Sequence, residues 1–234
     1  MGINRLAWDS DFFGLQVGET ENDTNLLNLD NYDLIIIKQN RDEIVNFPNF
    51  EKTFQETKVI FNKILNYDSL CCNDTSVIDF DDIPIRKDFF YPLAFESGKY
   101  SRFKLDPNFN QNKFELLYCK WVDNSVTKEF ADKIFYIKEL NQVIGFVSVK
   151  NNFDFSTIGL IAVDENHQGK GIGKKMVLKV EQYCMSKNIF ELRIPTQKEN
   201  IPGCHFYSNM GFFIKEETIF KHYWKISYIK KNKF

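Results

Sequence analysis

The sequence lacks several features that define large classes of protein. In its 234 residues no apolar run approaches the ~20 residues that a membrane helix needs, and the tightest run, Leu34–Ile37, has the length of a buried strand. Lys and Arg total 30 against 32 for Asp and Glu, so the net charge of -2 supplies no bulk field for a nucleic acid or an anionic membrane. These shortages predict a soluble protein with neither kind of partner.

Cysteine and histidine are also scarce. The five Cys include no CxxC pair, and the three His are widely separated, so we expect neither a disulfide framework nor a metal site. The amino terminus lacks the basic region and the long apolar core of a signal peptide. Together these features predict a cytoplasmic enzyme or binding protein.

Hydrophobic and aromatic residues, in contrast, are abundant. They make up 43% and 16% of the chain, with 24 Phe, which excludes intrinsic disorder and allows one or two domains. In the first half, residues 34–38 and 53–65 are predicted strands, and a polar stretch over residues 66–82 is predicted to be a loop. We therefore predict a smaller N-terminal α/β domain over residues 1–88, on the acceptor side, and a second domain over residues 89–234.

The second half alternates regularly between helix and strand patterns. The predicted elements are a helix over 112–122, a hairpin over 135–149, a strand over 157–163, a helix over 174–187, a strand over 189–195, a short helix from 201, and strands over 212–220 and 223–229. The last strand could pair with a second copy in a homodimer or remain a solvent-facing edge.

The most informative stretch is a turn that follows the strand over 157–163. Gly169, Gly171 and Gly173 alternate there and lead into a helix. Glycines let the backbone approach an anion closely, the first free N–H groups of the helix point at it, and Lys170 and Lys174 add positive charge. The turn is therefore predicted to hold a pyrophosphate, with a glycine-rich helix cap as the alternative.

Three phosphate-binding patterns compete for this turn. A Walker loop would place Ser or Thr after Gly-Lys, but here Lys174 is followed by a second lysine, and the spacing also departs from the dinucleotide pattern G-x-G-x-x-G. The third pattern, Gln/Arg-x-x-Gly-x-Gly/Ala, is matched by Gln168, Gly171 and Gly173. Here the chain resembles the GCN5-related N-acetyltransferase (GNAT) superfamily, in which this turn holds the pyrophosphate of coenzyme A.

A second segment, residues 200–212, resembles the Asn, Phe-Tyr, Gly-Phe element of that superfamily. The resemblance implies a mixed, mostly antiparallel sheet flanked by helices, with acetyl-CoA as co-substrate. It also implies that Asn200 contacts the pantetheine arm and that Tyr207 protonates the departing thiolate. The implied cofactor-binding residues are Ile161, Ala162, Val163, Gln168, Gly169, Lys170, Gly171, Ile172, Gly173, Lys174 and Asn200.

Tyr207 also has a chemical case of its own. A phenol with a reference pKa near 10 can protonate a thiolate as the C–S bond breaks, although a core aromatic is the alternative interpretation. The base that removes the amine proton stays unassigned. Asp154, Glu199 and His205 are candidates by position, and each is also interpretable as an ordinary surface residue.

The acceptor is indicated by resemblance alone. Residues 6–15 and 100–107 look like those of the dTDP-fucosamine acetyltransferase group. This implies direct transfer of acetyl to a dTDP-linked amino-dideoxy sugar in a ternary complex, with dTDP-4-amino-4,6-dideoxygalactose as the favoured substrate and Ser101 and Arg102 as acceptor-binding residues. The alternatives are a GNAT acetyltransferase that acts on a protein or peptide amine and a non-catalytic acyl-CoA sensor.

Overall fold

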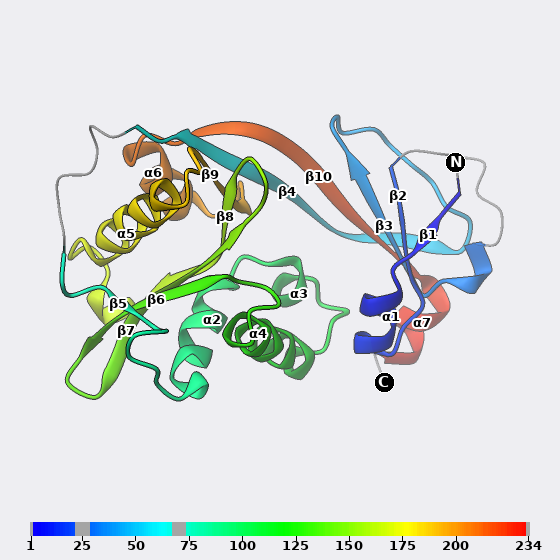
Figure 1. The fold of residues 1–234 in the computed structure, drawn as a ribbon. Helices are drawn as coiled ribbons and strands as arrows, with labels where there is room; N and C mark the ends of the chain where they lie inside the picture. The colour runs from blue at the N-terminus through cyan, green and yellow to red at the C-terminus, as the bar shows by residue number, and fades with distance from the viewer. Residues whose placement is uncertain (1, 22–28, 67–73, 233–234) are drawn as a thin grey trace.

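The computed structural model describes residues 2–21, 29–66 and 74–232, whose strands form one ten-stranded sheet (Figure 1). Its strand order is β1-β2-β3-β10-β4-β9-β8-β7-β6-β5. The strands are β1 (Asn4–Arg5), β2 (Val17–Thr20), β3 (Leu34–Gln39), β4 (Phe50–Ile64), β5 (Ile78–Asp79), β6 (Lys133–Glu139), β7 (Gln142–Asn151), β8 (Ser156–Val163), β9 (Glu191–Gln197) and β10 (Phe213–Lys225). Only the β2–β3 and β8–β9 pairs among these described strands are parallel.

Two groups of helices cover opposite faces of the sheet. The helices are α1 (Ala7–Phe13), α2 (Tyr91–Ser97), α3 (Arg102–Leu105), α4 (Gln111–Val126), α5 (Ile172–Ser186), α6 (Ile201–Asn209) and α7 (Ile226–Asn232). Figure 1 shows α5 and α6 on one side of the central strands and α2, α3 and α4 on the other. Val177 of α5 is buried with Phe61 of β4 in one core, whereas Leu93 of α2 and Leu117 of α4 belong to a second core. The predicted mixed, mostly antiparallel sheet flanked by helices is confirmed.

The central parallel pair, β8 and β9, is joined at one end only. Ser156 pairs with Leu192 and Thr157 with Arg193, and no further pair between these two strands is formed in the described residues. On its other side β8 stays paired with β7 as far as Val163. The edge of β8 that faces β9 is therefore left without a strand partner toward its carboxyl end.

The long strand β4 connects the two halves of the chain. It lies between β9 and β10 and pairs with both, so a strand from the first 88 residues is part of the same sheet as the second half (Figure 1). The core around α2 likewise combines Phe13 and Leu34 with residues beyond 89. A domain boundary near residue 88 stays a prediction. Residues 67–73 of the polar stretch predicted as a loop lie outside the described residues.

The carboxyl-terminal segment differs from the prediction of two strands over 212–220 and 223–229. β10 is one strand as far as Lys225, and helix α7 follows it. The sequence between Phe220 and Tyr223 is Lys-His, which has no residue typical of a turn, and both residues are paired with β3 and β4. The end of β10 is therefore internal, so the expectation that it offers an edge to a second copy is wrong.

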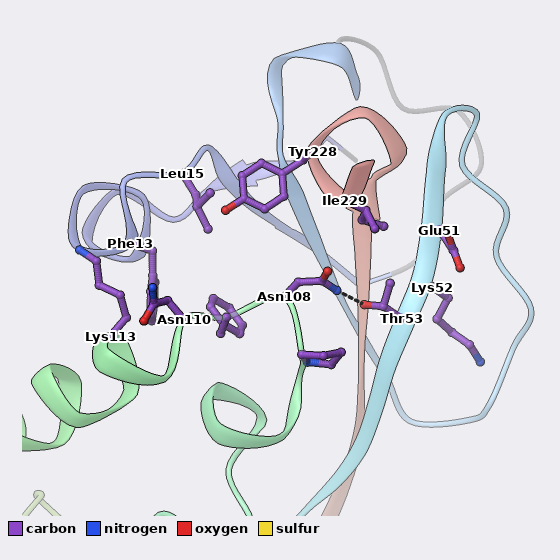
Figure 2. Close-up of a pocket in the computed structure, with 12 residues that line it drawn as sticks. Phe13, Leu15, Glu51, Lys52, Thr53, Asn108, Asn110, Lys113, Tyr228 and Ile229 are labelled. Carbon is purple, nitrogen blue, oxygen red and sulfur yellow. Dashed lines mark hydrogen bonds between the residues drawn. The ribbon is translucent and has the colours of Figure 1, made fainter. Parts of the chain in front are cut away.

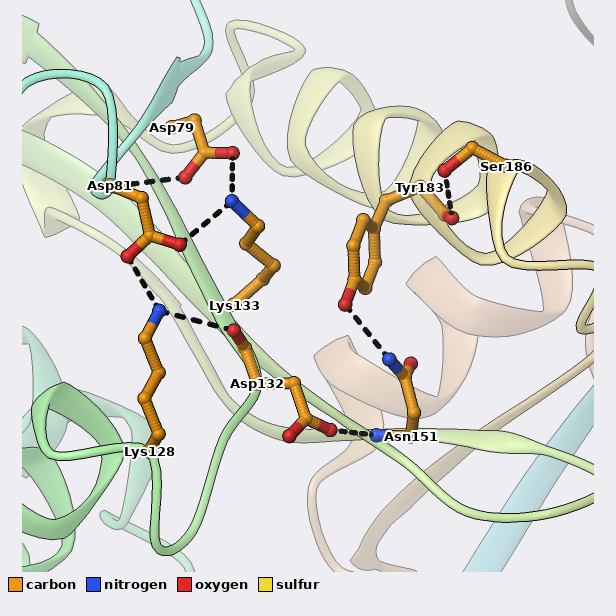
Figure 3. Close-up of polar contacts among 8 residues, drawn as sticks. All are labelled: Asp79, Asp81, Lys128, Asp132, Lys133, Asn151, Tyr183 and Ser186. Carbon is orange, nitrogen blue, oxygen red and sulfur yellow. Dashed lines mark hydrogen bonds and ion pairs between the residues drawn. The ribbon is translucent and has the colours of Figure 1, made fainter.

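The short edge strand β5 is held by charged side chains (Figure 3). Lys133 Nζ lies 2.7 Å from both Asp79 Oδ2 and Asp81 Oδ2, and Lys128 bonds to the second carboxylate of this group. Burial alone would lower the pKa of Lys133, but the two carboxylates raise it above its usual range. This arrangement attaches the segment before α2 to β6.

A buried ion pair connects β4 to α5. Lys63 Nζ lies 2.6 Å from Glu181 Oε1, and the Glu181 side chain is only 2% exposed. Breaking such a pair by removing one partner leaves an uncompensated buried charge, whereas replacing both partners with apolar residues is often neutral.

We therefore expect Lys63→Met to lower the free energy of unfolding by about 3 kcal/mol, because Glu181 is left buried without its partner. Lys63→Met combined with Glu181→Leu should recover most of that loss. Urea unfolding followed by circular dichroism measures both variants. A loss below about 1 kcal/mol in the single variant would contradict a structural role for the pair.

Candidate active site

The glycine turn places an uncapped helix end at the carboxyl end of β8. Gly169 and Gly171 have φ angles of 75° and 79°, a left-handed conformation that other residues adopt only with strain. Gly171 precedes α5, and no side chain in the described residues caps that helix. Because the first N–H groups of a helix have no acceptor within it, they are available to an anion.

Polar contacts around the turn hold it in place. Gln168 Nε2 donates to the Val163 carbonyl at 3.2 Å. His167 bridges Asp164, at 2.8 Å from Nδ1, and Glu139, at 2.9 Å from Nε2. The hydrogen bond from His167 lowers the pKa of Asp164. Gln168 therefore shapes the turn through its side chain.

A cavity of about 650 Å³ opens in front of this helix end. It brings together most of the residues that were predicted to bind the cofactor: Ile161, Ala162, Val163, Gln168, Gly169, Gly171, Ile172, Gly173, Lys174 and Asn200. Tyr207 lines it as well. Lys170 does not, and instead borders a smaller hollow beside Lys175, so of the two predicted lysines only Lys174 belongs to the cavity.

Tyr207 faces this cavity from α6 but is otherwise enclosed by aromatic rings. It is 6% exposed, with the rings of Phe61, Phe206 and Phe212 at centroid distances of 5.5, 5.4 and 6.3 Å. Burial raises the pKa of Tyr207. The phenol therefore keeps its proton at neutral pH and can only act as a proton donor.

Asn200 has a clear structural role at the start of α6. Its Oδ1 accepts from the N–H of Gly203 at 3.1 Å, and its Nδ2 donates to Thr196 Oγ1 at 3.1 Å. Asn200 lines the cavity with a side chain whose two ends both have partners. A contact between Asn200 and pantetheine stays a prediction.

A second cavity, of about 740 Å³, lies between α1, α7, β4 and the segment that leads into α4 (Figure 2). Phe13, Phe109, Lys113 and Tyr228 are among its lining residues. It is larger than the first cavity, but neither the glycine turn nor Tyr207 borders it. The smaller cavity is therefore the candidate site of the reaction.

Comparison with known proteins agrees with this geometry. The model of the acetyltransferase (GNAT) family matches residues 95–212, which is half of the chain and includes the glycine turn and Tyr207. The chain belongs to the acetyltransferase (GNAT) family. The predicted activity, an acetyl-CoA-dependent acetyltransferase, is confirmed at this level.

Individual relatives of this GNAT protein are distant. Streptothricin acetyltransferase A of Bacillus subtilis (strain 168) is 28% identical over 122 residues, which cover 52% of this chain and 69% of that protein. Streptothricin acetyltransferase of Escherichia coli is 24% identical over 82 residues, so the match spans only 35% of this chain and 47% of the relative. A functionally unknown conserved protein from Staphylococcus epidermidis ATCC 12228 shares the fold, with a TM-score of 0.56 at 12% identity over 91% of this chain and 85% of that one.

The two residues predicted to bind the acceptor of this GNAT enzyme lie beside the cavity and do not line it. Ser101 is 5% exposed, and its hydroxyl accepts from the N–H of Phe103 as the cap of α3. The Arg102 guanidinium lies between the rings of Phe103 and Phe220. The sequence analysis missed Glu96, Ser97, Lys99 and Tyr100, which line the cavity just before them.

None of the three candidate bases is well placed by contact. Asp154 is exposed in the turn between β7 and β8, and His205 is exposed on α6. The Glu199 carboxylate accepts from the N–H of Thr57 at 3.1 Å. A different acid, Glu56 of β4, is buried close to Arg102, and sequence reasoning missed it because it lies far from the recognised motifs.

Two further searches bear on ligands and location. Across residues 2–21, 29–66 and 74–232, no group of three His, Cys, Asp or Glu residues is placed to hold a metal ion. In the same ranges no helix is both long and apolar enough to span a bilayer.

Lys170 and Lys174 provide a matched test of the turn. We expect Lys174→Ala to weaken CoA binding about fivefold, roughly 1 kcal/mol, because Lys174 lines the cavity, and Lys170→Ala to change it less than twofold. Isothermal titration calorimetry at low salt measures both dissociation constants. Equal losses in the two variants would contradict this geometry.

Proposed function

We propose that the protein transfers the acetyl group of acetyl-CoA to a primary amine by direct attack within a ternary complex. The observation that carries this proposal is the uncapped start of α5, which follows two left-handed glycines and opens into the same cavity as Tyr207. The helix end suits the pyrophosphate of CoA, and the phenol suits its departing thiolate.

The transfer then uses groups that the fold already holds in position. The free edge of β8 over Ile161–Val163 offers backbone N–H groups that polarise the thioester carbonyl. The neutral amine forms a C–N bond to this carbon, the C–S bond breaks, and Tyr207 supplies the proton that the CoA thiolate takes up. Water returns a proton from the new amide nitrogen to Tyr207.

For the acceptor, we propose a dTDP-linked amino-dideoxy sugar, with dTDP-4-amino-4,6-dideoxygalactose as the first choice. Support comes from the cavity of Figure 2, where Phe13 and Leu15 of one resembling segment meet Pro107 of the other. Phe109 and Tyr228 supply further rings there, and rings of this kind suit a thymine face. Arg102 remains the proposed partner of the diphosphate. A homodimer and a cytoplasmic location stay predictions.

Streptothricin is the second candidate acceptor. Two curated relatives are named streptothricin acetyltransferases, and the B. subtilis protein matches this chain over 122 residues. A peptide amine and a non-catalytic acyl-CoA sensor remain the alternatives outside this class.

A panel of amines separates these acceptors. We expect CoA release from acetyl-CoA with dTDP-4-amino sugars, measured with a thiol reagent, and much slower release with dTDP-3-amino sugars, streptothricin or a peptide. Release with streptothricin alone would overturn the sugar assignment and keep the acetyltransferase. No release with any amine would favour the sensor.

Tyr207→Phe tests the proton donor. We expect kcat to fall by about 10²-fold, because the thiolate must leave without its acid, while CoA affinity stays within twofold of the wild type. The matched variant Tyr183→Phe removes a phenol that bonds to Asn151 away from the cavity, and it should leave kcat unchanged. An unchanged rate in Tyr207→Phe would remove the acid role.

A further inference from the structure

The side chain of Glu56 is buried in an incomplete ion pair. It is 4% exposed, and in the sheet it lies directly beside Phe220 of β10. Arg102 Nη1 lies 3.9 Å from Glu56 Oε1, yet within the described residues neither Glu56 Oε2 nor Arg102 Nε has a hydrogen-bond partner. Buried polar atoms are nearly always hydrogen-bonded, because leaving one unpaired is costly.

Arg102 is held in a way that keeps the pair incomplete. Its guanidinium is fixed between two rings, 4.9 Å from the centroid of Phe103 and 4.7 Å from that of Phe220. The backbone N–H of Arg102 also donates to the Glu56 carboxylate. One carboxylate is therefore anchored on one side by α3 and retains an acceptor oxygen for a further donor.

Glu56 adjoins the acceptor side of the reaction cavity. Tyr100, which lines the cavity, precedes Arg102 by two residues, a chain distance of at most about 8 Å. On the other side, Glu199 is bonded to the N–H of Thr57, and the next residue, Asn200, also lines the cavity. The contacts of β4 around Glu56 thus reach two borders of the cavity.

We propose that Glu56 binds the ammonium group of the acceptor and removes its proton before acetyl transfer, an inference that rests on the proposed function. The ammonium N–H donates to Oε2, the proton moves to the carboxylate, and the nitrogen keeps its electron pair for attack on the thioester carbon. Glu56 then releases this proton to water. The acceptor is accordingly a primary amine that enters protonated.

The surroundings of Glu56 suit this role. Burial raises its pKa to about 7, Glu199 raises it further, and Arg102 and Lys58 oppose the shift. Tyr118 of α4 also faces it, and there burial raises the pKa of the phenol to about 12, so that group stays neutral. A base that titrates near the working pH transfers protons most effectively.

Kinetics of Glu56→Gln test the proposal with the best amine of the panel. We expect kcat/KM at pH 7 to fall about 10²-fold with KM for acetyl-CoA unchanged, and log kcat/KM below pH 7 to rise one unit less steeply with pH than in the wild type. Glu56→Asp should restore part of the loss. Glu115→Gln, which neutralises an exposed acid on α4, is the control.

Two kinetic results would overturn the proposal. Glu56→Gln could keep more than half of the wild-type kcat/KM, or it could lose activity with no change in the slope of its pH profile, which would indicate a purely structural role. Either result leaves the proposed function intact as long as the wild type acetylates an amine. A wild type that acetylates none contradicts the proposed function itself.

Thermal unfolding provides a readout that needs no acceptor. Because the pKa of Glu56 is raised from 4.5 to about 7 in the folded protein, its ionisation destabilises the fold as pH rises through this range. Glu56→Gln should therefore match the wild-type Tm at pH 4.5 and exceed it at pH 8. The same Tm difference at both pH values would show that Glu56 does not titrate in this range and would overturn its role as the base.

Discussion

The candidate site depends on one constraint in the sheet, namely that β8 and β9 are hydrogen-bonded to each other at one end only. Two parallel strands that stayed paired would leave no free N–H groups on β8 and no entrance between them. Because they are not, the turn after β8, the start of α5 and the ring of Tyr207 from α6 all border one cavity. Acetyl transfer requires this meeting of an anion site, a carbonyl-polarising edge and an acid, and the partial pairing provides it.

β4 determines what the second substrate meets. Val59 and Phe61 of this strand pack on the side of α5 and α6, whereas Glu56 lies beside Arg102 of α3. The two buried acids treated above differ in the same way. Glu181 has a lysine at 2.6 Å and strengthens the packing of α5, whereas Glu56 has an arginine at 3.9 Å and keeps a free oxygen. Stability explains the first pair, and chemistry is the better explanation of the second.

Sequence reasoning succeeded where the physical cause is local. Gly169 and Gly171 take up left-handed φ angles, and Asn200 caps the helix that carries Tyr207, so the spacing of these residues alone predicts both elements. It failed where the cause is distant. Glu56 meets Arg102 only because β4 inserts between β9 and β10, and β10 was read as two strands because its partners on both sides are far away in the chain. Ser101 and Tyr100 are neighbours in sequence, yet one is a helix cap and the other lines the cavity.

The position of β10 also affects how the protein reaches this fold. It is the last strand in the described sequence, but it lies between β3 and β4 near the centre of the sheet. During synthesis β3 and β4 cannot be joined until residue 213 and those after it are available, so the sheet closes late. Pairings between segments this far apart in sequence make folding slow. The two halves of the chain are therefore expected to fold as one cooperative unit, even though the residues that bind CoA come from the second half alone.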